Sequence, residues 1–131
     1  MRYFVIIIIV FSLNSYCQDT INKYWKTGKL LSKGILKDEK EQGKWTYYYE
    51  NGNKWSEGLY ENGVKTGEWT YWYENKVIKE KTFVEKGPSY SYYPDGKIKL
   101  LGQMKDYKKT GLWIEFYNNG KKKTEINYIE D

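Results

Sequence analysis

A short pattern of glycine and aromatic residues recurs along this chain and limits what it can fold into. Each copy opens with glycine, runs through aromatic and polar residues, and ends at a turn sequence such as Glu-Asn-Gly or Asn-Asn-Gly. A unit of about 20–24 residues is too small to bury a core alone, so repeats of this length stack on their neighbours. The units begin near residues 19, 43, 67, 87 and 111, and the first is the weakest copy.

The residues within one unit favour a β-hairpin. Trp, Tyr, Phe, Thr and Ile suit the pleated surface of a strand. Asn-Gly and Asp-Gly supply the positive φ angles that tight hairpin turns need. No helical apolar period follows Leu13, so we expect an all-β fold. The predicted architecture is an array of repeated β-hairpins that form one elongated, twisted antiparallel sheet.

Three sets of residues define the repeat: an opening glycine, a tryptophan two residues later, and a tyrosine just before the turn. We expect the tryptophans to stack repeat on repeat, since buried aromatic side chains dominate core energetics. The third and fourth copies depart from the pattern, with Lys76 at the turn-glycine position and Ser89 at the tryptophan position. The defining residues are Gly43, Gly67, Gly87 and Gly111; Trp45, Trp69 and Trp113; and Tyr49, Tyr73, Tyr93 and Tyr117.

A second aromatic row alternates with the first, on the opposite face of the predicted strands. A single-layer sheet usually buries one face and leaves the other in water. Either the sheet coils enough to enclose one row, or one row is exposed for a partner. Trp55 lies where other copies have Leu or Lys, and interfaces favour such aromatic anchors. The candidate partner-binding residues are therefore Tyr48, Trp72, Tyr92, Phe116 and Trp55.

The N-terminus has the pattern of a signal peptide. Arg2 precedes an apolar run of about eleven residues, which fits a signal-peptide core and is too short to span a membrane. We predict a signal peptide at residues 1–17 and a repeat domain at 18–131, with export to the periplasm, the outer surface or the medium. The alternative is a lipoprotein that carries its lipid on Cys17.

Composition argues against catalysis. The chain has no His and one Cys, which removes His-based acid–base chemistry and most zinc sites. The carboxylates Glu57, Glu80 and Glu115 could in principle act in pairs, but no pattern places two of them across a cleft. We expect no enzymatic activity, no cofactor and no metal. The net charge of +5 is spread over scattered lysines, so nucleic acid is not an expected partner.

The unit resembles the MORN repeat, and more closely the bacterial variant of YwqK-type antitoxin proteins. The resemblance covers about residues 19–131. It implies β-hairpin arrays that serve as protein- or lipid-contacting scaffolds, without catalysis. The matching segments are Gly43–Gly58, Gly67–Phe83, Gly87–Gly102 and Gly111–Tyr128, with Tyr24–Gly34 as a weaker match.

The sequence thus predicts an exported scaffold that binds another protein through an aromatic face or an edge strand. An antitoxin-like role is one form of such binding. The repeat also resembles cell-wall-binding repeats, which hold choline or sugar between hairpins, so a carbohydrate- or choline-binding module is an alternative. Peripheral binding to an anionic membrane through lysines and aromatics is a further alternative.

Overall fold

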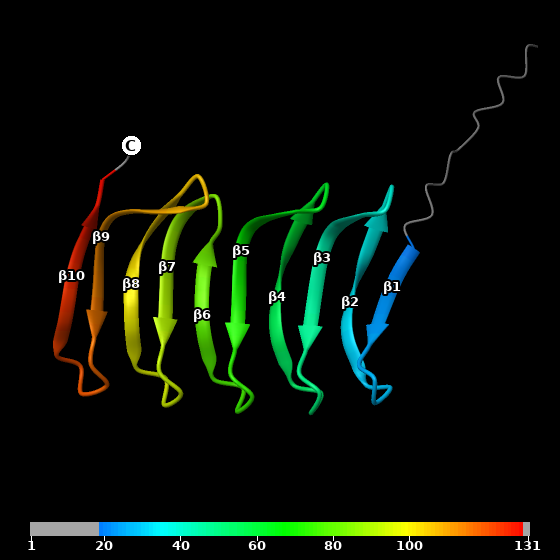
Figure 1. The fold of residues 1–131 in the computed structure, drawn as a ribbon, viewed down its shortest axis with the longest axis horizontal. Helices are drawn as coiled ribbons and strands as arrows, with labels where there is room; N and C mark the ends of the chain where they lie inside the picture. The colour runs from blue at the N-terminus through cyan, green and yellow to red at the C-terminus, as the bar shows by residue number, and fades with distance from the viewer. Residues whose placement is uncertain (1–18, 130–131) are drawn as a thin grey trace, which may run out of the picture.

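The computed structural model describes residues 19–129, with side chains from Thr20 onward. In this range ten strands form one antiparallel sheet in sequence order, from β1 to β10, and there is no helix (Figure 1). The predicted all-β hairpin array is confirmed. The predicted signal peptide and the alternative lipid site at Cys17 lie outside the described residues. The strands are β1 (Asp19–Tyr24), β2 (Leu30–Lys37), β3 (Lys40–Tyr48), β4 (Lys54–Glu61), β5 (Val64–Trp72), β6 (Ile78–Phe83), β7 (Lys86–Tyr92), β8 (Ile98–Lys105), β9 (Lys108–Phe116) and β10 (Lys122–Tyr128).

The turns that close each unit share one geometry. In the second unit the Gly52 amide donates to the Tyr49 carbonyl at 2.9 Å, and the Tyr49 amide donates to the Asn53 carbonyl at 2.9 Å. Gly52 has φ 87°, a conformation that glycine adopts at little cost. Lys76 takes the same place in the third unit with φ 69°, so the turn forms without its glycine.

The tryptophans of the first aromatic row form the core. Trp45, Trp69 and Trp113 are 1%, 0% and 4% exposed. The Trp69 ring lies against Gly58 on the preceding strand, where an added Cβ would be 2.3 Å from the ring. The Trp69 Nε1–H donates to the Leu59 carbonyl at 3.2 Å. The other two make the same contacts: Trp45 with Gly34 and Ile35, and Trp113 with Gly102 and Gln103.

Where a copy lacks the tryptophan, the glycine of the preceding strand is replaced as well. Ser89 replaces the tryptophan, and its partner on the preceding strand is Thr82 rather than glycine. Both side chains are buried, at 5% and 7% exposure. Glycine is needed only where an indole ring on the following strand lies against it, so the loss of the tryptophan at position 89 permits a side chain at position 82.

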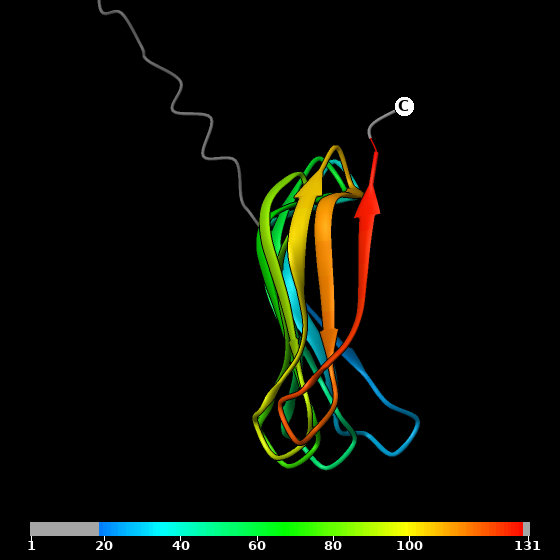
Figure 2. The same ribbon diagram turned by 90° about the vertical axis from the view of Figure 1, so that its left-hand side faces the viewer.

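Bulges bend the strands over the tryptophan row. Gly43, Gly67 and Gly111 have φ of 67°, 63° and 61°, and the strand register shifts beside each of them. Such bulges increase local twist and bend the chain. Figure 2 shows the strands curving along their length. The sheet therefore coils enough to enclose the tryptophans of the first aromatic row.

The turn aromatics tie each unit to the next. The Tyr49 hydroxyl donates to the carbonyl of Trp72, which ends the first strand of the following unit, at 2.8 Å. This bond recurs along the array and adds a second row of inter-unit contacts at the turn end of the sheet. Its other members are Tyr73 to Tyr92, Tyr93 to Phe116, and Trp25 through its Nε1–H to Tyr48.

The glycine–tryptophan contact predicts a large effect for a small substitution. Gly58→Ala places a methyl group against the Trp69 ring, so we expect the free energy of unfolding to fall by about 2–3 kcal/mol. Urea unfolding followed by tryptophan fluorescence measures this loss. The matched control is Thr82→Ala, at the same place in its unit but with Ser89 instead of an indole on the following strand, which should cost about 1 kcal/mol or less. Equal losses in the two variants would contradict the contact.

Candidate functional site

The face opposite the buried tryptophans, here called the open face, carries the residues that alternate with them along each strand. The strand register shows which open-face residues lie opposite one another at the middle of the strands, here called the middle row. Thr46 pairs with Glu57 in the second unit, and Tyr90 pairs with Leu101 in the fourth. The open face has two parts of different chemistry, one charged and one apolar.

The apolar part, here called the apolar patch, covers β7, β8 and β9. Tyr90, Leu101 and Ile114 pair across these strands in the middle row. Tyr90, Ile98 and Leu112 are 37%, 43% and 46% exposed, and the remaining members are half-buried. Contiguous exposed apolar surface of this kind typically marks an interaction site. The apolar patch consists of Tyr90, Tyr92, Ile98, Leu101, Leu112, Ile114 and Phe116.

The charged part lies on β3 and β4 and centres on Glu57. Its carboxylate accepts from Lys44 Nζ at 2.8 Å, Lys54 Nζ at 2.7 Å and Thr46 Oγ1 at 3.1 Å. Partial burial raises the pKa of Glu57, but the hydrogen bonds from Lys44, Lys54 and Thr46 outweigh it and lower this pKa to about 2. Glu57 is therefore ionised at neutral pH and holds both lysines on the open face.

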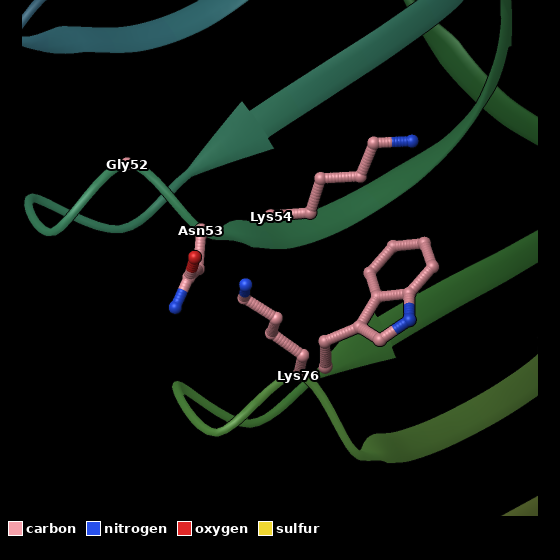
Figure 3. Close-up of a pocket in the computed structure, with 5 residues that line it drawn as sticks. Gly52, Asn53, Lys54 and Lys76 are labelled. Carbon is pink, nitrogen blue, oxygen red and sulfur yellow. The ribbon is translucent and has the colours of Figure 1, made fainter.

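A pocket opens beside this cluster at the turn end of the sheet. It has a volume of about 390 Å³ and is lined by Gly52, Asn53, Lys54, Trp72 and Lys76. Figure 3 shows Lys54 and Lys76 reaching it from two neighbouring units. Lys54 Nζ also lies 5.7 Å from the centre of the Trp72 ring. A pocket lined by two lysines and one aromatic ring suits an anionic group, such as a carboxylate.

The structure divides the five predicted partner-binding residues into three places. Tyr92 and Phe116 belong to the apolar patch. Tyr48 and Trp72 stand in the same row of the open face but border the charged part. Trp55 lies on the tryptophan side of the sheet, 41% exposed, with its ring centre 6.1 Å from that of Tyr47.

Five residues of the apolar patch were missed by the sequence analysis: Tyr90, Ile98, Leu101, Leu112 and Ile114. Strand alternation could have predicted Tyr90 and Ile114, because they directly follow Ser89 and Trp113 and therefore lie on the opposite face. Ile98 and Leu101 lie on the second strand of their hairpin. Their row depends on the register with β7, which the sequence pattern does not show.

The three carboxylates considered for catalysis lie on separate strands. Glu57 bonds to its lysines on β4, and Glu115 on β9 forms an ion pair with Lys123 at 3.1 Å. Glu80, on β6, pairs with Tyr71 of β5, and burial raises the pKa of its carboxyl. Residues 19–129 contain no group of three or more His, Cys, Asp or Glu residues that could hold a metal. No helix within the same residues is long and apolar enough to cross a membrane.

Comparison with known proteins identifies the family of the repeat. A family model described as a MORN repeat variant matches residues 41–62, 65–86, 85–106 and 109–130. The chain belongs to this family. It is thus a MORN-repeat scaffold, and the β1–β2 hairpin before the matched segments has the same turn, with Gly28 at φ 82°. None of the curated proteins compared with the chain matches it.

The Glu57 cluster makes stability depend on pH in a defined direction. The pKa of Glu57 is lowered to about 2 from an ordinary value of 4.5. Its contribution is therefore complete above pH 4.5 and is lost as the pH falls towards 2. Glu57→Gln should reduce the free energy of unfolding at pH 7 by about 1 kcal/mol.

Urea unfolding at pH 7, 4.5 and 2.5 measures this dependence. The wild-type chain should lose more stability on acidification than Glu57→Gln. Glu61→Gln, at the exposed end of the same strand, is the matched control and should retain the wild-type dependence. An identical acid dependence in wild type and Glu57→Gln would contradict the role of the cluster.

Proposed function

We propose that this MORN-repeat protein is an exported, non-enzymatic scaffold that binds a partner protein through the apolar patch. The observation that carries the proposal is the exposure of Tyr90, Ile98 and Leu112 on three adjacent strands. The tryptophan row already supplies the core of this single-layer sheet. The patch therefore adds little to the internal packing and is available to a partner.

The charged part of the open face, which β5 and β6 separate from the patch, indicates what the partner surface carries. Lys44 and Lys54 border the open face on β3 and β4, and Lys76 lines the adjoining pocket. A partner that covers both parts would place apolar side chains on β7–β9 and carboxylates over β3–β5. Charge complementarity of this kind speeds association and selects the partner.

The remaining features of the proposal come from the sequence. The predicted signal peptide at residues 1–17 supports export, and the lack of His in the chain supports a role without catalysis. Neutralising a toxin by binding it would be one instance of the proposed function. The pocket beside Trp72 gives no support to a choline site, because its two lysines would repel a quaternary ammonium group.

A second candidate is an anionic membrane surface. The combination of open-face lysines with exposed Tyr90 and Leu112 favours it, since basic residues add attraction to anionic lipids while apolar side chains insert at the interface. The two candidates differ in what the apolar patch touches in the producing cell.

Site-specific photo-crosslinking in the producing cell tests the proposal. A photoreactive phenylalanine analogue is placed at Leu112 in the patch, and at Val64, an exposed apolar residue of β5 outside it. We expect one protein adduct from Leu112 and none from Val64. Adding Tyr90→Asp should reduce the Leu112 adduct at least tenfold, because a carboxylate in the centre of an apolar contact costs more than 1.4 kcal/mol.

The control for folding is the thermal unfolding midpoint of each variant, which should stay within a few degrees of the wild type. Val64→Asp should leave the Leu112 adduct unchanged. A lipid adduct at Leu112, with salt-sensitive binding to anionic vesicles, would show that the patch binds a membrane and would reject the protein partner. Equal protein adducts from Leu112 and Val64 would reject the patch as the binding surface.

A further inference from the structure

The hydrogen bonds that link successive units end at Tyr117. In the four preceding units, the turn aromatic donates to a carbonyl of the next unit, as Tyr93 does to Phe116 at 2.8 Å. Tyr117 occupies the same place in the last unit and is 50% exposed. Its hydroxyl lies where a further strand beside β10 would present a carbonyl group.

A hollow at the same edge has the shape of an inter-unit contact. Between the second and third units, Trp69 packs on Tyr60 and Tyr47 of the preceding hairpin, with ring centres 5.1 and 6.4 Å apart. At the β10 edge the corresponding region is a hollow of about 320 Å³. Its lining includes Trp113, Leu100, Thr124, Ile126 and Tyr128. An apolar side chain from an added strand would fill it.

Ile126, at the centre of β10, limits which side chain an added strand can place against it. Glycine on one strand is followed by tryptophan on the next, and Thr82 is followed by Ser89. β10 carries Ile126 in this column, opposite Trp113, so an indole ring could not lie flat against it. The added strand needs a smaller apolar residue, and β1 carries Ile21 there, opposite Gly34.

We propose that β10 of one copy pairs with β1 of the next, so that the repeat array continues from chain to chain. The strands are antiparallel, as at every other junction in the sheet. Ile21 of the second copy packs on Ile126, and Tyr117 donates to the carbonyl of Tyr24. Lys122 then lies over the Tyr24 ring, as Lys54 lies over Trp72 within the chain.

The charges at this junction predict how salt changes the strength of association between copies. Lys122 and Lys123 are paired with Glu125 and Glu115 in their own chain. The turn of the last unit ends in Lys121, and the first turn of the next copy carries Lys26 and Lys29, so like charges meet at the turn end. Added salt screens such repulsion. Association should therefore strengthen between 0.05 and about 0.5 M NaCl.

A head-to-tail contact of this type is heterologous and leaves a free edge on each side. It produces an open series of oligomers, with no fixed end point. The junction uses strand edges and leaves the apolar patch uncovered, so it is independent of the proposed partner binding.

Sedimentation velocity of the purified protein, in the form its producing cells contain, tests the proposal. The mean mass should rise continuously with protein concentration. Tyr117→Phe should weaken association about fivefold, the value of one hydrogen bond, without changing the urea midpoint. Tyr93→Phe, the matched control, removes the same bond inside the chain. It should lower the urea midpoint and leave association unchanged. Ile126→Lys should abolish association.

Three results would overturn the junction. The first is a monomer at every concentration up to about 1 mM, a weak-binding limit. The second is a dimer of fixed mass, which an open-ended contact cannot give. The third is loss of association in Tyr90→Asp with full association in Ile126→Lys, which would place the contact on the open face. The Leu112 adduct should persist in Ile126→Lys, which separates this test from that of partner binding.

Discussion

The structure depends on one contact, an indole ring lying against a glycine of the preceding strand. The Trp69 ring leaves no room for a side chain at Gly58, and its N–H bonds to the carbonyl of the next residue, Leu59. The contact needs a bare backbone on one strand and a bulge on the other. Because both features recur in the second, third and fifth units, a sheet one layer thick acquires a buried core of its own.

This internal core explains why the other face can carry function. In most single-layer sheets the apolar face is covered by another element. Here the coiled sheet covers its own tryptophans, so open-face residues such as Tyr90 and Leu112 need not contribute to a core. The patch begins on β7, the strand on which Ser89 replaces the tryptophan, and it continues over β8 and β9, where Trp113 still lies against Gly102 on the other face.

Much of the fold follows from local sequence. The turn residues predict each hairpin, and the repeated tryptophans predict a stacked row, because both signals lie within one unit. The pairing of Trp45 with Gly34 joins residues on different strands, so no local pattern reveals it. The site was predicted only in part for a similar reason. Ile98 and Leu101 enter the patch through the register between β7 and β8, and a register shift beside Tyr47 brings Trp55 to the tryptophan side.

The bond from each indole to its neighbouring strand can be observed directly. Native-state hydrogen exchange of the indole N–H groups, followed by NMR, reports whether each is held inside the sheet. Trp45, Trp69 and Trp113 should exchange only when the whole domain unfolds, since their rings are buried and their N–H groups bond to carbonyls of the preceding strand. Trp55 and Trp72, on the surface, should exchange orders of magnitude faster. Exchange of the three core indoles at the rate of Trp55 would contradict the account.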